Sequence, residues 1–287
     1  MPELPEVETV RRGLAPVMVG ARFDRVELRR ADLRFPLPPN FVSRLEGARV
    51  ESLDRRGKYL IASLSTGESL IMHLGMSGRF TVEAGATPRP GKFYFAERAA
   101  PRHDHVIFHM QGDKGRTRIV YNDPRRFGLM DVAGIGGLQS NRHMKGMGPE
   151  PLGPSFTAAV LAAALRSRTA PIKGALLDQR VVAGIGNIYA CEALFRAGIS
   201  PRRKARSVSG ARSARLHRAL IDVLSEAIEA GGSSLKDFAG SDGALGYFQH
   251  RFQVYDREGL ACSLCDAPVR RIVQAGRSTF YCGACQK

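Results

Sequence analysis

The sequence Cys262-Ser-Leu-Cys265, followed after sixteen residues by Cys282-Gly-Ala-Cys285, decides the fold of the C-terminal part of this chain. Two Cys-x-x-Cys pairs separated by an insert of hairpin length place four thiolates tetrahedrally around one zinc ion. The alternatives are two disulfides or four free thiols. Since four thiolates complete the coordination sphere, we expect one structural Zn²⁺ per chain and no catalytic metal.

The insert between the two cysteine pairs is basic, because it carries Arg270, Arg271 and Arg277. A rigid hairpin that presents arginines can contact the phosphates of a nucleic acid. The fifth cysteine, Cys191, falls in an apolar helical stretch, where we expect a small buried residue.

Composition agrees with a nucleic-acid partner. The chain has 287 residues, which is enough for two domains, and its 43 Lys and Arg against 27 Asp and Glu give a formal net charge of +16. Such an excess favours a polyanion through counterion release, although a merely soluble basic protein is the alternative. No apolar run reaches the roughly 18 residues of a membrane span, and the N-terminus lacks a signal-peptide pattern. We therefore expect no membrane contact, a cytoplasmic location, reduced or metal-bound cysteines, and a monomer.

The chain changes its pattern twice. A short helix is expected to begin at Pro5 and to close at Gly13 and Pro16. Short β-rich runs over 21–132 predict an antiparallel sandwich or barrel, with a long loop at 84–102. A Gly- and Pro-rich linker near 146–154 precedes the helical part, and strand-like segments return near Gln249. Helices are expected over 155–166, 172–179, 187–197 and 209–230.

Two further features suggest chemistry. The Gly-rich turn in Val182–Tyr189 opens a helix, where free N–H groups can bind a phosphate, although many such turns are purely structural. If Met1 is removed, Pro2 carries a secondary amine that is partly neutral at cellular pH and can attack a sugar carbon to form an iminium. Glu3 would lie beside it and could move protons. Taken alone, most chains that begin Met-Pro-Glu have no catalytic terminus.

The N-terminal sequence Pro2-Glu-Leu-Pro-Glu-Val-Glu-Thr-Val-Arg-Arg-Gly resembles the signature of formamidopyrimidine-DNA glycosylases. The resemblance extends from residue 2 to the last cysteine, in the order of the family's motifs, and is weakest at 84–102. The other motifs are Arg55-Arg-Gly-Lys-Tyr-Leu, His73-Leu-Gly-Met-Ser-Gly, His103-Asp-His, Asn122-Asp-Pro-Arg-Arg-Phe-Gly, Gly148-Pro-Glu-Pro-Leu, Gly184-Ile-Gly-Asn, Leu235-Lys-Asp-Phe and Gly276-Arg-Ser-Thr-Phe-Tyr-Cys.

The resemblance implies a multidomain α+β fold. An N-terminal antiparallel β-sandwich with a leading helix would span 2–133, followed by a linker over 134–154. A helix–two-turn–helix DNA-binding domain would span 155–248, and a zinc-binding β-hairpin 249–287. The implied activity is repair of damaged double-stranded DNA, associated with the nucleoid. Oxidised purines (8-oxoguanine and formamidopyrimidines) would be excised, and the abasic site would be cut by β,δ-elimination.

The resemblance also assigns catalytic roles. Pro2 would be the Schiff-base nucleophile, Glu3 the adjacent acid/base, and Lys58, on a strand, the group for proton transfer in β-elimination. Arg277 would grip the phosphates that flank the lesion and take part in the δ step. Asn187 would bind a phosphate at the helix turn.

Excision requires the base to leave the stack, so the gap must be filled. The resemblance assigns this to Met76, Arg125 and Phe127, which would otherwise be core or surface residues. A loop over Gly231–Tyr247 would close over the flipped base. His103 and His105 could look like a metal pair, but they lack a third ligand. Further backbone contacts are implied for His103, Arg125, Arg126, Arg168 and Lys173.

Two alternatives remain at this point. A sister class, the endonuclease VIII type, prefers oxidised pyrimidines; Leu4 and a filling triad drawn from two loops favour the purine enzyme. A non-catalytic zinc-ribbon DNA-binding protein would explain the charge and the cysteines. It would not explain Pro2, Glu3 and Lys58 together.

Overall fold

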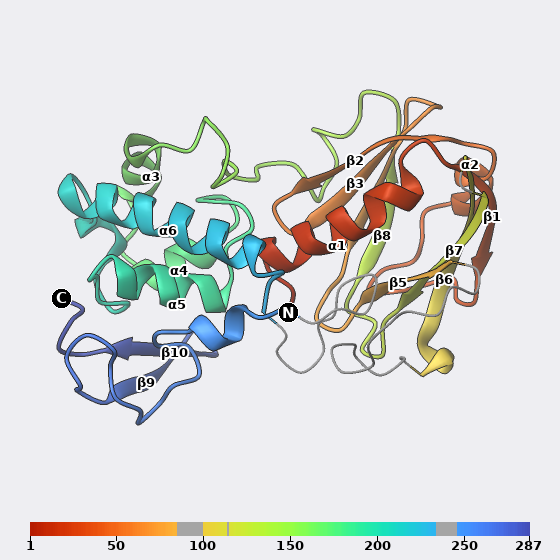
Figure 1. Cartoon of the computed structure of the whole chain (residues 1–287). Helices are drawn as coiled ribbons and strands as arrows, with labels where there is room; N and C mark the ends of the chain where they lie inside the picture. Colours follow the sequence, from red (N-terminus) through yellow and green to blue (C-terminus); the bar gives the residue numbers. More distant parts are fainter. Residues whose placement is uncertain (85–99, 114, 234–245) are drawn as a thin grey trace. The chain divides into compact units, whose positions relative to one another are not determined.

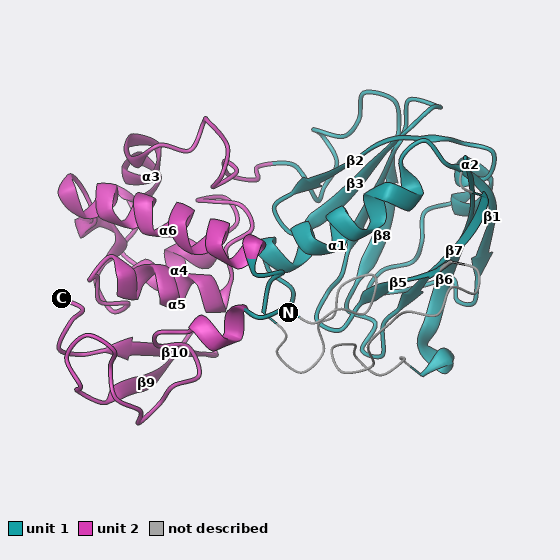
Figure 2. Ribbon diagram, viewed as in Figure 1, with its two compact units in different colours: residues 1–145, 230–247 teal, residues 146–229, 248–287 magenta. Residues whose placement is uncertain are grey.

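The computed structural model describes residues 1–84, 100–113, 115–233 and 246–287 (Figure 1). They form two compact units (Figure 2): Met1–Lys145 with Ala230–Tyr247, and Gly146–Glu229 with Phe248–Lys287. The cysteine hairpin and the helical part belong to the same unit. Most of the expected loop at 84–102 and of the expected closing loop lies outside the described residues. No helix in the described part of the chain is long and apolar enough to cross a membrane.

The first unit is an antiparallel β-sandwich, as expected. Each of its two sheets has four strands, in the orders β1-β6-β7-β5 and β2-β3-β4-β8. Side chains of both sheets enter one apolar core, in which the rings of Phe23 and Phe108 meet edge to face at 5.3 Å. The strands are β1 (Arg22–Leu28), β2 (Val50–Arg56), β3 (Tyr59–Leu64), β4 (Ser69–His73), β5 (Arg79–Ala84), β6 (Asp104–Gly112), β7 (Gly115–Asn122) and β8 (Leu129–Ala133).

The leading helix α1 (Leu4–Met18) is longer than predicted. It was expected to end at Gly13 and Pro16, but both residues lie inside it. Leu14 and Met18 continue the buried face of the helix into the sandwich core, and this burial outweighs the hydrogen bond that a proline inside a helix forfeits. A one-turn helix, α2 (Phe41–Leu45), was not predicted.

The second unit contains the predicted helices, each within a few residues of its expected bounds. The helix α6 packs against α3 and α5, and α5 packs against the cysteine hairpin. The hairpin turns at Ala275 and Gly276, whose φ angles of 49° and 71° give the two left-handed residues of a type I′ turn. The elements are α3 (Ala158–Leu165), α4 (Ile172–Leu177), α5 (Asn187–Arg196), α6 (Ala211–Glu229), β9 (Val269–Gln274) and β10 (Arg277–Cys282).

Helix α5 anchors the segment that leads into the hairpin. The fully buried carboxylate of Glu192 accepts hydrogen bonds from the main-chain N–H groups of Gln253, Val254 and Tyr255 at 2.8–3.0 Å. Burial raises the pKa of Glu192, and the three donors oppose that rise. Cys191 is buried beside it, against the zinc-ligand cysteines Cys262 and Cys282, which confirms its predicted structural role.

Candidate functional site

The start of α1 is buried, with Pro2 and Glu3 both inside the first unit. The main-chain N–H of Glu3 donates to Glu6 Oε2 at 2.8 Å, and Glu6 Oε1 accepts the N–H and the hydroxyl of Ser233, both at 2.9 Å. Glu6 therefore fixes the position of Glu3 from one side and of Ser233 from the other. Neither Glu6 nor Ser233 was singled out in the sequence; the capping-box spacing of Glu3 and Glu6 was the available signal.

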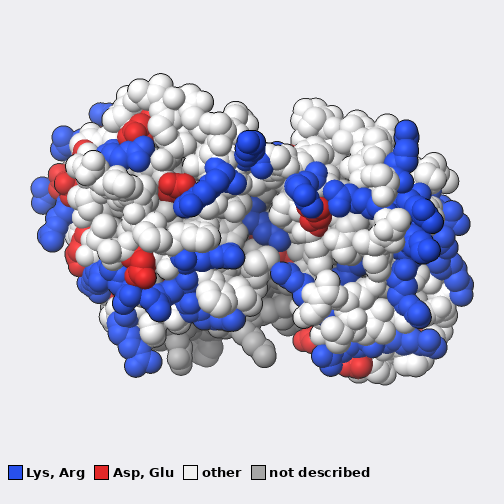
Figure 3. Space-filling model, turned by 180° about the vertical axis from the view of Figure 1, so that it is seen from behind, with Lys and Arg blue, Asp and Glu red and all other residues white. Residues whose placement is uncertain are grey.

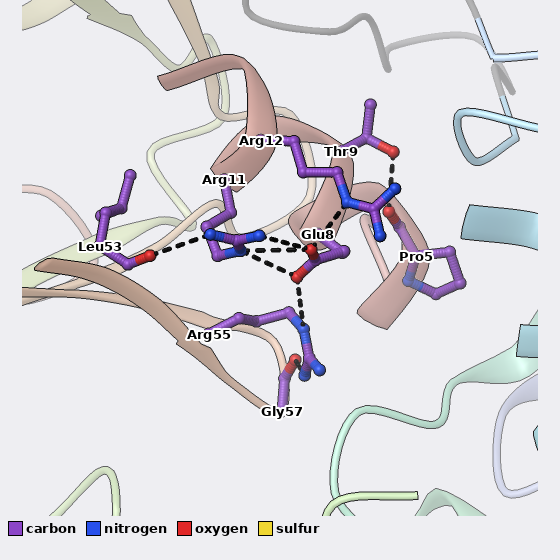
Figure 4. A network of polar contacts seen from close by, with 8 residues as sticks. All are labelled: Pro5, Glu8, Thr9, Arg11, Arg12, Leu53, Arg55 and Gly57. Carbon is purple, nitrogen blue, oxygen red and sulfur yellow. Dashed lines mark hydrogen bonds and ion pairs between the residues drawn. The ribbon is translucent and has the colours of Figure 1, made fainter. Parts of the chain in front are cut away.

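Helix α1 is tied to the β2–β3 turn through the carboxylate of Glu8 (Figure 4). Arg11 Nη2 and Arg12 Nε donate to Glu8 Oε1 at 2.8 and 2.9 Å, and Arg55 Nε donates to Glu8 Oε2 at 3.3 Å. Arg55 also donates to the carbonyl of Gly57 at 3.0 Å. Burial alone would raise the pKa of Glu8, but the hydrogen bonds from Arg11 and Arg12 and the charge of Arg55 hold the pKa below its usual value.

This turn carries Lys58, which was expected on a strand. The strands end at Arg56 and begin again at Tyr59, so Lys58 lies in the turn, where it is 7% exposed. Next to it, burial and then the positive charges of Lys58, Arg34 and His143 lower the pKa of His73 to about 3. His73 is therefore neutral at pH 7, and its Nδ1 accepts the N–H of Gly75 at 3.0 Å.

The three expected gap-filling residues lie on two adjoining loops. The guanidinium of Arg125 lies 4.8 Å from the ring centroid of Phe127, which is 43% exposed. Met76 is half-buried on the loop between β4 and β5. The loops touch at Gly75, where φ is +64° and a Cβ would lie 2.3 Å from backbone atoms of Phe127 and Gly128.

A buried carboxylate that the sequence analysis missed joins these loops. Asp123 is fully buried; its Oδ1 accepts the hydroxyl of Ser77 at 2.6 Å, and its Oδ2 accepts the N–H of Gly128 at 2.8 Å. The Ser77 hydroxyl oxygen in turn accepts the N–H of Arg125 at 3.2 Å. An aspartate before a proline is a common turn former, which was the available signal. Asp123 thus sets where both loops present their side chains.

In the second unit, two residues expected to contact DNA converge on strand β10. Lys173 is fully buried, and its ammonium donates to Thr279 Oγ1 at 2.6 Å and to the carbonyl of Ser278 at 3.1 Å. The amide of Asn187 donates to the same carbonyl at 3.0 Å. The ammonium of Lys173, which the resemblance assigns to the DNA backbone, is thus bonded to the hairpin in this structure. Arg277, just before Ser278, is exposed.

The other residues predicted to contact DNA differ in their exposure and in their partners within the protein. Arg126 is exposed, with φ +54° and Asp32 Oδ2 at 3.8 Å. Arg168 donates to Asp178 at 2.9 Å. Asp178 also binds Arg180, and these hydrogen bonds lower its pKa. His103 is half-buried and accepts the N–H of Asp123 on its carbonyl at 3.0 Å.

The four hairpin cysteines fit a zinc ion. Their sulfur atoms all lie within 4.8 Å of one another, with 3.9 Å between Cys262 and Cys285 and 3.5 Å between Cys265 and Cys282. Tetrahedral Zn–S bonds of about 2.3 Å place sulfurs roughly 3.8 Å apart. The N–H groups of Leu264 and Cys285 also point to cysteine sulfurs at 3.5 Å. These cysteines form a structural zinc site, because four thiolates leave no open position.

Two relatives match the sequence of this chain over its full length. Formamidopyrimidine-DNA glycosylases of Ruegeria pomeroyi and Rhodopseudomonas palustris are 57% and 54% identical to this chain, and the alignments cover 100% of each protein. The chain belongs to the formamidopyrimidine-DNA glycosylase family. The family's N-terminal domain matches residues 1–130, its H2TH domain residues 147–239, and a zinc finger found in FPG and IleRS residues 259–287.

Solved structures of this glycosylase family agree with the fold. The MutM (Fpg) protein of Thermus thermophilus is 42% identical, with a TM-score of 0.85 over 99% of this chain and 98% of that one. The Lactococcus lactis enzyme in complex with a Fapy-dG containing DNA is 33% identical, with a TM-score of 0.85 over the full length of both chains.

We predict that Asp123→Asn destabilises the glycosylase by about 1–3 kcal/mol, because one buried donor of Ser77 or Gly128 loses its acceptor. Glycosylase activity should fall by more than the unfolded fraction accounts for, since both filling loops shift. Urea unfolding and initial rates would be measured beside Asp24→Asn, an exposed aspartate of the same unit that should cost less than about 0.5 kcal/mol. Equal effects of the two substitutions would contradict the assigned role of Asp123.

We predict that Glu8→Gln lowers the free energy of unfolding at pH 7 by about 1–3 kcal/mol, because it removes charge-assisted hydrogen bonds. The folded-state pKa of Glu8 is lowered, so its contribution to stability is present above the ordinary glutamate pKa of 4.5 and is lost as pH falls through the lowered pKa. Denaturant unfolding of both proteins at several pH values should show the stabilities converging in acid. A difference that stays constant into acid would contradict this.

Proposed function

We propose that this chain is a base-excision DNA glycosylase that removes oxidised purines from duplex DNA and then cuts the abasic strand as a lyase. The observation that carries the proposal is the connection of the buried Pro2–Glu3 end of α1 to the Lys58 turn through Glu8. Relatives of the same fold support the substrate, since their solved structures hold DNA that contains Fapy-dG or carbocyclic 8-oxo-G. Such an enzyme would act in the cytoplasm, on the nucleoid.

The first chemical step belongs to Pro2. Once Met1 is removed, the deprotonated proline nitrogen attacks C1′ of the damaged nucleotide, the glycosidic bond breaks, and the base departs with the bonding electron pair and takes up a proton. The resulting aminal loses the proline N–H proton, and its C1′–O4′ bond then breaks while O4′ takes up a proton, which leaves an iminium between Pro2 and the ring-opened sugar. Glu3, held through Glu6, exchanges protons with the sugar and the leaving base.

Strand cleavage follows from the iminium. Loss of a C2′ proton expels the 3′ phosphate, and a second elimination expels the 5′ phosphate. Lys58, in its buried turn next to neutral His73, takes part in the first proton transfer. Arg277 binds the phosphates that flank the lesion, and Asn187 binds a further phosphate. Lys173 acts as a positioning residue, since it holds the carbonyl of Ser278 beside Arg277.

Base extrusion uses the two adjoining loops of the sandwich. Met76 enters the gap, and the stacked Arg125–Phe127 pair takes the place of the lost stacking partner. Arg126, His103 and Arg168 contribute contacts to the DNA backbone. A second candidate substrate, an oxidised pyrimidine, is supported by a solved complex of the Lactococcus lactis enzyme with DNA that contains one.

The first prediction of this proposal concerns substrate choice and the catalytic amine. The enzyme should nick duplexes with 8-oxoguanine opposite cytosine much faster than duplexes with dihydrouracil opposite guanine, and borohydride should trap a covalent complex. A variant extended by one residue before Pro2 should lose trapping, because the nitrogen is then an amide without a nucleophilic lone pair. Preferred cutting at dihydrouracil would assign the pyrimidine class. Undiminished trapping by the extended variant would refute proline catalysis.

The second prediction concerns the zinc site. Cys282→Ala should release zinc and weaken DNA binding, because metal binding and the folding of such modules are coupled and the hairpin presents Arg277. Zinc content by atomic absorption and DNA affinity would be measured together. The control is Cys191→Ala, which alters the same core cluster without removing a ligand. Full affinity in a zinc-free preparation of Cys282→Ala would show that the hairpin does not depend on the metal.

A further inference from the structure

The second unit has a hollow of about 660 Å³ that plays no part in the proposed chemistry. We call it the basic hollow. It lies on the segment between α5 and α6 and includes the end of the chain, and it contains none of the residues assigned above to the lesion. Its lining residues are Ser200, Arg202, Arg203, Lys204, Arg206, Ser207 and Lys287.

The charge of the basic hollow has one sign. Five of its seven lining residues are basic and none is acidic. Within the described part of the chain, no carboxylate forms a salt bridge with Arg202, Lys204 or Arg206. Like charges this close repel one another, so an unpaired cluster of them gains from a bound anion.

A hollow of the first unit provides the contrast. Its volume is about 450 Å³, and its lining mixes Arg25, Arg116 and Arg118 with Asp24 and Glu83. There the charges pair internally, as Arg116 does with Asp24 at 3.9 Å and Arg118 with Glu83. The lining of the basic hollow contains no such acidic partners. Basic side chains predominate among the charged residues on the face drawn in Figure 3.

The main chain of the basic hollow is held in place. The carbonyl of Arg203 accepts the N–H of Ile172 at 2.7 Å, and the N–H of Arg206 donates to the carbonyl of Arg168 at 2.9 Å. The side chain of Arg203 is fixed as well, since its Nε donates to the main-chain oxygen of Lys287 at 3.2 Å. The exposed cations of the segment therefore extend from a fixed backbone, which lowers the entropy lost when they bind a ligand.

The basic hollow is connected to the elements that present Arg277. Its segment is hydrogen-bonded to the start of α4, the helix whose Lys173 holds Ser278. On the other side, Gln274 Nε2, next to the hairpin turn, donates to the carbonyl of Pro201 at 3.3 Å. A ligand bound in the basic hollow would thus contact a segment that is hydrogen-bonded to both α4 and the hairpin that carries Arg277.

We propose that the basic hollow is a second phosphate-binding surface, which takes the sugar–phosphate backbone of duplex DNA in addition to the contacts of Asn187 and Arg277. This inference rests on the proposed function, since it concerns the same DNA. Several guanidinium groups suit phosphate oxygens, and such contacts give affinity without sequence preference. Duplex DNA fits better than an acidic peptide because the whole chain has a net charge of +16 and its neighbouring hairpin presents further arginines.

The experiment measures salt dependence of binding to undamaged duplex DNA. The variant Arg202→Gln/Lys204→Gln/Arg206→Gln removes three exposed charges and keeps Arg203, which makes structural hydrogen bonds. Each lost phosphate contact should reduce the slope of log affinity against log salt by about 1. Single-turnover excision at saturating enzyme should stay unchanged, because these residues do not touch the reacting sugar.

The matched control is Arg22→Gln/Arg25→Gln/Arg116→Gln, which removes the same net charge from exposed positions of the first unit. Its slope should stay close to that of the unchanged protein. An equal loss of slope in both variants, or a loss in neither, would overturn the proposal. A loss confined to the first variant, in a protein that fails to cut 8-oxoguanine DNA, would support this surface and reject the proposed activity instead.

Discussion

The carboxylate of Glu8 joins the leading helix of the first unit to its β-sandwich. It lies on α1, while the guanidinium of Arg55 that reaches it comes from the β2–β3 hairpin and also holds the turn at Gly57. Arg11 adds a second tie, since its Nη1 donates to the carbonyl of Leu53 at 3.1 Å. These directed hydrogen bonds specify the position of α1 relative to the β2–β3 hairpin more sharply than apolar packing does.

The cluster is costly to build, because Glu8 and Arg55 leave water almost completely. The cluster specifies geometry, because the Glu8 carboxylate gains its full set of hydrogen bonds only when Arg11, Arg12 and Arg55 all lie in their observed positions. The second unit uses the same device with other groups. There the carbonyl of Ser278 receives both Lys173 and Asn187, so strand β10 has a fixed register relative to two helices. The zinc cysteines fix the far end of the same strand at Cys282.

Sequence reasoning found the features that periodicity and spacing encode. The cysteine spacing gave the metal site, and apolar patterning gave the helices of the second unit and most of the strands of the first. It failed where tertiary contacts decide. Helix α1 does not end at Pro16, because Leu14 and Met18 on either side of it are buried in the sandwich core. The burial of Lys173 was likewise not indicated by the sequence, since its acceptors Thr279 and Ser278 lie more than a hundred residues away.

The same distinction between local sequence signals and tertiary contacts applies to the site residues. The residues alone suggested an amine at Pro2, an adjacent acid at Glu3 and an arginine-bearing hairpin, but the family resemblance was needed to assign the roles of Pro2, Glu3, Lys58 and Arg277 position by position. Asp123 and Glu6 were missed, although they hold the loops and the chain start in place. Asp123 binds Ser77, 46 residues away in sequence, and Gly128, 5 residues away. Glu6 binds Ser233, which is 227 residues away. Only the pair spaced like a capping box, Glu3 and Glu6, had a local signal.

The burial of these carboxyl groups changes the balance of charged side chains on the surface. Among the described residues, the buried carboxylates are Glu3, Glu6, Glu8, Asp104, Asp123 and Glu192, while the buried ammonium groups are Lys58 and Lys173. Six carboxyl groups and two ammonium groups thus lie in the interior. The groups that remain exposed therefore have a larger excess of basic over acidic side chains than the 43 Lys and Arg and 27 Asp and Glu of the whole chain indicate. Exposed acidic groups are therefore too few to pair with all the exposed cations, and a polyanion such as DNA supplies the missing negative charge.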